Sequence, residues 1–204
     1  STVGGRAYQE DRLVATRLHG SADKTFFAVF DGHGGGRGSE FLSKNFYKTL
    51  LTHPKFGSLP IVALQETWAS FDDKCLKLLK EIENKDPKKI MPSDGSTATV
   101  CLINGNDIYL ANCGDSAAYV VHQDGRTELL TEDHGTANQE EVNRCLAAGG
   151  KLMPQFIHQP CLFPFCFLGR PAPTKPRMMP GGLLVTRSFG DFPSKLEYLG
   201  GKQG

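Results

Sequence analysis

The spacing of apolar residues changes from a helical period to a strand period near residue 95, and this change constrains the fold more than any other feature. Between residues 60 and 84 the apolar positions lie three or four residues apart, which predicts a long amphipathic helix. Residues 37–52 repeat this spacing and predict a second helix. From 95 to 131, four short apolar segments alternate with Asn-Gly, Gly-Asp and Asp-Gly turns, which predicts an antiparallel meander.

The other segments complete a mixed α+β architecture with antiparallel strands. Residues 25–30 read as a buried strand, and a further strand is expected over 182–192. A third helix is predicted to begin at Asn138, whose side chain can cap it, and to end at Gly149. Residues 151–180 hold seven of the twelve prolines, so we expect a long irregular segment or flap there.

Charge and cysteine content argue against several classes of protein. The chain has 23 Lys and Arg against 22 Asp and Glu, so no field of one sign exists to attract nucleic acid. The longest apolar run, residues 26–30, is far too short to span a membrane, and the N-terminal residues contain no apolar signal-peptide core. The six cysteines lie mostly in apolar runs, and the pair Cys161 and Cys166 alone is a weak zinc signal. We therefore expect an intracellular protein of the cytoplasm or nucleus.

The segment "FFAVFDGHGGGRG", residues 26–38, is the strongest candidate for a functional site. It lacks the Gly-Lys of a phosphate-binding Walker loop and the third glycine of a dinucleotide fingerprint. "HGGG" matches the oxyanion loop of esterases, but the chain contains no Gly-x-Ser-x-Gly nucleophile elbow. These three alternatives are therefore disfavoured.

A site for hard metal ions fits this segment better. A carboxylate at the end of a buried strand, Asp31, needs its charge compensated, and Gly32 lets the chain turn so that its carbonyl faces the same ion. In an extended chain Arg6 and Glu10 share one face, and Arg6 can hold a phosphate through two hydrogen bonds. His33 can donate a proton to a leaving oxygen. A simple turn at Asp31 and a surface pair of Arg6 with Glu10 remain the plain alternatives.

Seven segments together resemble a known family. They are "GGRAYQEDR", "FFAVFDGHGG", "DGSTATV", "LANCGDSAAYV", "TEDH", "EEVNRCLAAGG" and "GGLLVTRSFGDF". In order and spacing they are similar to the first two-thirds of the catalytic domain of metal-dependent protein phosphatases of type 2C. The resemblance implies a four-layer α-β-β-α fold, in which helix pairs flank a sandwich of two antiparallel sheets. It also implies an enzyme that hydrolyses phosphoserine and phosphothreonine in phosphorylated proteins with two Mg²⁺ or Mn²⁺ ions. We expect this enzyme to be a monomer.

The resemblance assigns four metal-binding residues. Asp31 matches the carboxylate that bridges both ions, and Glu10 and the Gly32 carbonyl match ligands of one of them. Asp115 matches the aspartate that helps to hold a third, weaker ion. Two hard cations would lower the pKa of a shared water, which then attacks phosphorus while the metals and a cationic side chain neutralise charge.

The resemblance also assigns three residues to catalysis without a covalent intermediate. Arg6 matches the arginine that holds the phosphate, and His33 matches the general acid for the leaving alkoxide. Asp11 matches an acid that lies behind the metal ligands. The role of Asp11 follows from the family pattern alone.

Two departures from the family pattern affect the interpretation. The later Asp-Gly-x-x-Asp and Asp-Asn motifs, which supply carboxylates to the second metal, are absent, so we expect residues 1–204 to be one incomplete catalytic domain. If the chain truly ended at 204, a pseudophosphatase or adaptor that keeps the fold for partner binding would be the alternative. Ala117 stands where the family usually has arginine, and residues 151–180 occupy the place of the flap, where we expect substrate selectivity.

Overall fold

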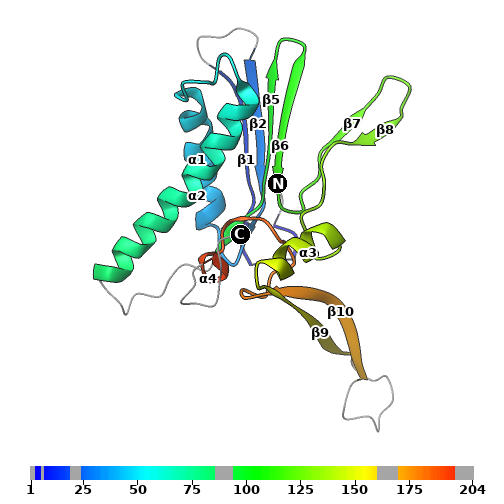
Figure 1. Cartoon of the computed structure of the whole chain (residues 1–204). Coiled ribbons are helices and arrows are strands. Elements are labelled where there is room, and N and C mark those ends of the chain that lie inside the picture. The colour runs from blue at the N-terminus through cyan, green and yellow to red at the C-terminus, as the bar shows by residue number, and fades with distance from the viewer. Residues whose placement is uncertain (1–2, 6, 19–23, 86–93, 160–169, 196–204) are drawn as a thin grey trace. The chain divides into compact units, whose positions relative to one another are not determined.

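The computed structural model describes residues 3–5, 7–18, 24–85, 94–159 and 170–195 (Figure 1). They divide into two compact units, Ser1–Asp133 with Arg187–Phe192, and His134–Thr186 with Pro193–Gly204. The helices and strands, in chain order, are β1 (Arg12–Arg17), β2 (Lys24–Phe30), β3 (Gly32–His33), α1 (Arg37–Leu51), α2 (Pro60–Lys85), β4 (Gly95–Ser96), β5 (Ala98–Asn104), β6 (Asp107–Cys113), β7 (Tyr119–Val121), β8 (Thr127–Leu129), α3 (Gln139–Ala147), β9 (Lys151–Gln159), β10 (Arg170–Met179), β11 (Phe189–Gly190) and α4 (Phe192–Lys195).

A four-stranded antiparallel sheet of order β1-β2-β5-β6 forms the centre of the first unit. Arg12 pairs with Phe30, and Ala98 pairs with Cys113. These pairs place the start of β1, the end of β2, the start of β5 and the end of β6 at one end of the sheet. A second, three-stranded sheet of order β11-β4-β3 continues from there. The antiparallel α+β fold class predicted from the sequence is confirmed.

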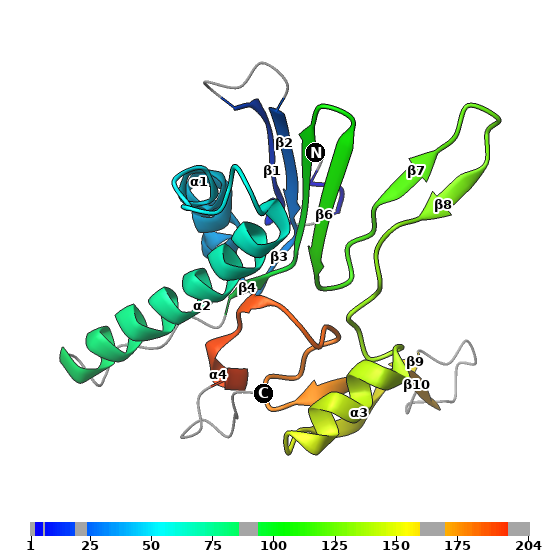
Figure 2. The ribbon, with the colours of Figure 1, turned by 45° about the horizontal axis from the view of Figure 1, so that its top comes forward.

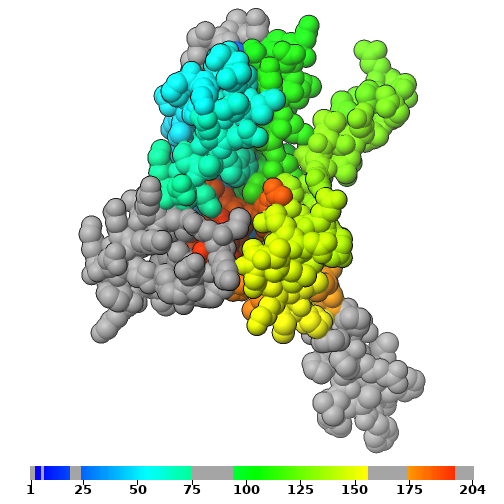
Figure 3. Space-filling model, viewed as in Figure 1, coloured from blue at the N-terminus to red at the C-terminus, as the bar shows by residue number. Residues whose placement is uncertain are grey.

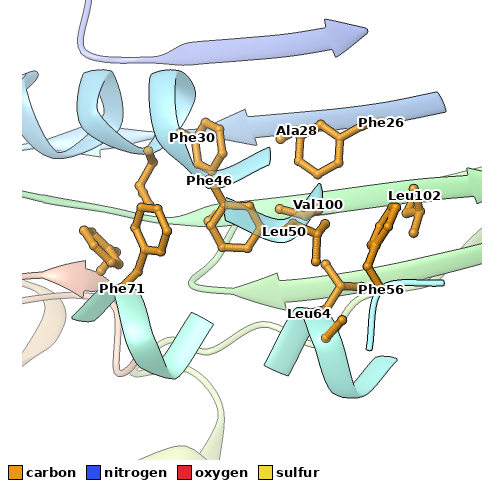
Figure 4. Close-up of a cluster of buried hydrophobic side chains, with 14 of the residues drawn as sticks. Phe26, Ala28, Phe30, Phe46, Leu50, Phe56, Leu64, Phe71, Val100 and Leu102 are labelled. Atoms are coloured by element: carbon orange, nitrogen blue, oxygen red, sulfur yellow. The ribbon is translucent and has the colours of Figure 1, made fainter. Parts of the chain in front are cut away.

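The hydrophobic core lies between one face of this sheet and helices α1 and α2 (Figures 2 and 4). In β2, Phe26, Ala28 and Phe30 are buried and alternate with exposed residues, as expected for a half-buried strand. Phe46 of α1 meets Trp68 of α2 edge to face, with ring centroids 5.3 Å apart. Burial of each such side chain contributes about 1.5–3 kcal/mol, so the predicted helical faces hold the helices on the sheet.

The opposite face of the four-stranded sheet also carries apolar side chains, but these are exposed. Leu13 is 61% exposed, Val29 49% and Ile108 58%. Leu13 pairs directly with Val29, so the exposed groups adjoin one another. The four-stranded sheet therefore has one packed face and one exposed apolar face.

The predicted meander is correct up to β6 and wrong after it. β5 pairs with β6, whereas β7 pairs with β8 in a separate two-stranded hairpin that projects away from the sheet (Figures 1 and 3). Gly114, with a φ of +107°, redirects the chain directly after β6. The hairpin carries exposed Tyr119 and Val121, so its apolar pattern did not indicate burial in the main sheet.

The prediction of an irregular segment over 151–180 is wrong for the described residues. β9 and β10 form an antiparallel ribbon, and residues 160–169, which separate them in the sequence, lie outside the described residues. A two-stranded ribbon has two free edges, where a proline costs no hydrogen bond. Pro176 lies in the irregularity between Thr174 and Arg177, where the pairing register shifts.

The other two predictions for the C-terminal part had different outcomes. Helix α3 is capped as expected, because the Asn138 side chain accepts hydrogen bonds from the backbone N–H groups of Glu140 and Glu141. A continuous strand over 182–192 is wrong: the chain there forms two isolated bridges and the two-residue strand β11. Positive φ angles at Gly182, Gly190 and Asp191 are incompatible with a continuous extended strand over this range. Within the described residues, no helix combines the length and the apolar composition needed to cross a membrane.

Candidate active site

Three aspartates gather at the end of the four-stranded sheet where its strands meet. Asp31 directly follows β2, and the pairing of Arg12 with Phe30 places Asp11 beside it. Asp115 follows β6 after the turn at Gly114. The charges of Asp11 and Asp115 both act on the Asp31 carboxyl group. The sheet therefore brings together three of the predicted site residues.

Thr97 holds the backbone of Asp31 from both sides. The Thr97 N–H donates to the Asp31 carbonyl at 2.8 Å, and the Asp31 N–H donates to the Thr97 hydroxyl at 3.2 Å. A further hydrogen bond of 2.8 Å joins the Thr97 and Ser116 hydroxyl groups. Sequence reasoning left Thr97 out, because a threonine in a strand pattern gives no sign that its hydroxyl fixes a neighbouring loop.

The pKa of the Asp31 carboxyl group is raised. Partial burial at the sheet end is the largest cause, followed by the charge of Asp11, a hydrogen bond with the Asp11 side chain and the charge of Asp115. The nearby His33 acts in the opposite direction. Crowded carboxylates of this kind favour a bound cation, which would relieve their repulsion.

Gly32 brings the backbone of Glu10 against the Asp31 loop. A Cβ atom at position 32 would lie 2.5 Å from the Glu10 carbonyl oxygen and 2.8 Å from the Ser39 hydroxyl, so only glycine fits. Ser39 in turn donates a hydrogen bond to that Glu10 carbonyl. Residues 10 and 32 therefore lie side by side. No hydrogen bond or ion pair to the Glu10 carboxylate occurs among the described residues, and Arg6 lies outside them.

His33 lies on β3 next to these carboxylates. Its Nε2 is 2.8 Å from Oδ2 of Asp191, and the two side chains are 29% and 3% exposed. Burial alone would lower the pKa of His33, but the hydrogen bond with Asp191 and the charges of Asp191, Asp31 and Asp115 offset burial and raise it. A histidine that holds its proton in this way is suited to act as an acid.

Sequence reasoning missed Asp191 although a signal was present. Four Asp-Gly or Gly-Asp pairs lie at the ends of strands in the first unit, and these pairs are Asp31-Gly32, Asp94-Gly95, Gly114-Asp115 and Gly190-Asp191. The repeated pattern could have pointed to Asp191 as a further carboxylate near the site. Its partner His33 is 158 residues away in the chain, so no local pattern could identify the contact.

The chemical types of these side chains suit a metal-binding site. Carboxylate oxygens are the ligands that Mg²⁺ and Mn²⁺ prefer, and the carboxylates of Asp11 and Asp115 lie close enough to Asp31 for their charges to act on it. Among the described residues, no three His, Cys, Asp or Glu side chains are arranged closely enough to hold an ion by themselves. A metal here would need further oxygen ligands, such as the Gly32 carbonyl and water.

Comparison with known sequences relates the chain to a family of phosphatases. The sequence profile described as "Protein phosphatase 2C" matches residues 4–202. "Probable protein phosphatase 2C 55" of Oryza sativa subsp. japonica is 38% identical over 152 residues, which cover 74% of this chain and 38% of that protein. "Probable protein phosphatase 2C 76" of Arabidopsis thaliana is 35% identical over 152 residues and is covered to 34%. The chain thus spans little more than a third of these two relatives.

Solved structures agree on the fold. A sex-determining protein of C. elegans superposes with a TM-score of 0.68 at 27% identity, over 93% of this chain and 42% of that one. A serine-threonine phosphatase 2C from Toxoplasma gondii superposes with a TM-score of 0.63 at 23% identity, over 91% of this chain and 69% of that one. The family match covers almost the whole chain. The chain therefore belongs to the protein phosphatase 2C family.

Proposed function

We propose that the protein containing this chain is a protein phosphatase that removes phosphate from phosphoserine and phosphothreonine with the help of two Mg²⁺ or Mn²⁺ ions. One observation carries the proposal: His33, whose ring is hydrogen-bonded to the Asp191 carboxylate, lies beside the group of carboxylates around Asp31. One group can provide a proton, and the other can hold cations. Hydrolysis of a phosphate ester needs both functions.

The metal-binding role falls to residues at the sheet end. Asp31, with the Gly32 carbonyl and Glu10, would hold the principal ions, and Asp115 would help to hold a weaker one. Bound cations would supply an activated water and would neutralise charge on the phosphoryl oxygens. The rigid backbone clamp from Thr97 supports this role, because it fixes the position of Asp31 before any ion arrives.

The remaining roles concern the phosphate and the leaving group. His33 would donate a proton to the serine or threonine oxygen as the bond to phosphorus breaks, because an alkoxide is a poor leaving group. Arg6 would hold the phosphoryl oxygens through paired hydrogen bonds. Asp11, whose charge acts on the Asp31 carboxyl group, would orient that carboxylate. The substrates would be phosphorylated proteins, and the β9–β10 ribbon is the proposed selectivity element.

Two further properties belong to the same proposal. An intracellular location, in the cytoplasm or nucleus, is supported by Cys101, which is a free thiol. The enzyme would act as a monomer. These properties follow from family resemblance and composition, and each can be measured independently of activity.

A second candidate is a pseudophosphatase or adaptor that binds a partner through this fold. The exposed apolar face with Leu13, Val29 and Ile108 favours it for a chain that consists of these residues alone. Release of phosphate from a phosphothreonine peptide separates the two candidates, when the complete protein is assayed with Mn²⁺ and after chelation. We expect turnover that requires Mn²⁺ and is lost in Asp31→Asn. Absent turnover would favour the adaptor. Turnover unaffected by the chelator would favour a mechanism that does not use metal ions.

A further inference from the structure

We propose that Asp191 is a positioning residue for His33, which holds Nε2 of the ring so that Nδ1 delivers the proton to the leaving oxygen. This inference rests on the proposed function, because it assumes that His33 is the general acid. In the step, the Nδ1–H bond breaks as the leaving oxygen gains the proton and its bond to phosphorus is cleaved. The ring becomes neutral, retains its proton on Nε2, and stays hydrogen-bonded to Asp191.

The three-stranded sheet β11-β4-β3 brings the two residues together. His33 of β3 pairs with Gly95 of β4, and Gly95 pairs on its other side with Gly190 of β11. Asp191 directly follows Gly190. Its carboxylate crosses the central strand to reach Nε2 of His33, at 2.8 Å.

Gly95 makes this crossing possible because it has no side chain. A Cβ atom built at position 95 would lie 2.3 Å from Oδ2 and 2.6 Å from Oδ1 of Asp191, inside the contact distance of real Cβ atoms. The clash is with the carboxylate itself, and this carboxylate is 3% exposed and has little room to move. The glycine at position 95 therefore has a defined role, to leave the path from Asp191 to His33 open.

Several contacts hold Asp191 in an unusual backbone conformation. In the described part of the chain, Asp191 is the sole non-glycine residue with a positive φ, +50°. Ser188 donates a hydrogen bond from its hydroxyl to Oδ2 of Asp191. The Gly190 N–H donates to the Asp72 carboxylate of α2 at 3.2 Å, and Phe189 packs on Phe71 with ring centroids 6.1 Å apart. Such conformations persist where the surroundings enforce them, and they cluster at functional sites.

Comparison with a second buried carboxylate shows what distinguishes Asp191. Asp94 is 4% exposed, bonds Arg37 at 2.7 Å and accepts a hydrogen bond from the Gly38 N–H at 3.0 Å. Its partners belong to the first turn of α1, so Asp94 stabilises the start of a helix. Asp191 instead forms a hydrogen bond with His33, a partly exposed histidine beside the carboxylates of the site. A buried carboxylate that fixes the ring of a catalytic histidine is a recurring arrangement in enzymes.

The test compares two substrates with different needs for a proton. Hydrolysis of a phosphothreonine peptide expels an alkoxide, whereas p-nitrophenyl phosphate expels a stable phenolate that needs no acid. In the complete Mn²⁺-loaded protein, Asp191→Asn should lower kcat for the peptide roughly 10- to 100-fold, with KM and the aryl phosphate rate nearly unchanged. His33→Gln should give the same pattern, and the double variant should lose little more than His33→Gln alone.

Two variants guard against a general loss of structure. Gly95→Ala keeps both polar side chains but blocks the path between them, so it should reproduce the selective loss seen with Asp191→Asn. Asp94→Asn is the matched control, since it changes a carboxylate equally buried but bonded to α1. It should affect the two substrates equally and mainly lower the melting temperature.

Nuclear magnetic resonance of ¹⁵N-histidine-labelled, metal-free protein provides a readout independent of activity. We expect a downfield imidazole proton bound to Nε2 of His33, which disappears in Asp191→Asn and in Gly95→Ala. Equal losses on both substrates, additive losses in the double variant, or no change of this resonance would overturn the inference. If the wild type hydrolyses neither substrate, the proposed function fails and the catalytic part of the inference with it, whereas the resonance still decides whether Asp191 orients the ring.

Discussion

Asp31 and Thr97 exchange two hydrogen bonds, so the residue at the end of β2 is fixed by the residue at the start of β5. Thr97 is 2% exposed, and its hydroxyl contacts both the Asp31 N–H and the Ser116 hydroxyl. Thr97→Val keeps the shape and the backbone bond but leaves the Asp31 N–H without its partner. Because an unsatisfied buried donor costs about 1–3 kcal/mol, the free energy of unfolding should fall by that amount. Urea denaturation measures this change.

Thr97→Ser is the matched control for this prediction. It keeps the hydroxyl and removes only a methyl group, so it should lose less stability than Thr97→Val. The valine variant should also bind Mn²⁺ more weakly, because Asp31 is held less firmly. Equal stability and equal metal affinity in the two variants would show that the hydroxyl group has no role at this position.

The Gly32 loop provides a second prediction, which concerns packing. Gly32→Ala would place a Cβ atom 2.5 Å from the Glu10 carbonyl, so the backbone there would have to shift. The resulting shift should lower the free energy of unfolding by about 1–3 kcal/mol. Gly57→Ala, where an added Cβ would meet nothing within 4 Å, is the control and should leave stability nearly unchanged. If both variants melt at the same temperature in calorimetry, the predicted close approach is wrong.

The helices, and the position of Asp31 directly after a buried strand, could be predicted because local sequence determines them. The periodic Leu64, Trp68 and Phe71 indicated α2, and the strand ending at Asp31 indicated the site. The ribbon β9–β10 could not be predicted, because its prolines argue against strands unless one knows that both edges are free. The bond between His33 and Asp191 depends on the pairing of three short strands, and two-residue strands have no period to detect.

Glu40 gives a prediction about pH. Hydrogen bonds from Lys44 and Arg12 lower the pKa of Glu40 from 4.5 to about 2. A carboxyl group with a lowered pKa in the folded state stabilises the protein above its unfolded pKa, and this contribution is lost as the pH falls from 4.5 towards 2. The melting temperature of wild type should therefore exceed that of Glu40→Gln at about pH 7, and the gap should shrink at about pH 3.

A control for Glu40 is available on another helix. Glu140 is exposed in the first turn of α3, and no ion pair to it occurs among the described residues. Glu140→Gln should therefore change the melting temperature less than Glu40→Gln at neutral pH. High salt should also reduce the Glu40 effect, since exposed ion pairs are screened. A gap for Glu40→Gln that stays constant with pH would contradict the lowered pKa.

Asp31→Asn should have opposite effects with and without metal ions. The pKa of Asp31 is raised above 3.8 by burial and by the carboxylates of Asp11 and Asp115, so its ionisation at neutral pH opposes folding of the metal-free protein. Removing that charge should raise the melting temperature in the presence of a chelator. With Mn²⁺ the order should reverse, because an ion at 100 times its Kd stabilises the wild type by about 2.7 kcal/mol. The variant, which has lost the central ligand, should gain little.

Asp124→Asn is the matched control, since Asp124 is also followed by glycine but lies in the β7–β8 turn, where it accepts a hydrogen bond from the Arg126 N–H. In thermal denaturation, Mn²⁺ should raise the melting temperature of this control as much as that of wild type. If Mn²⁺ raises the melting temperature of Asp31→Asn by the same amount, Asp31 is not a metal ligand.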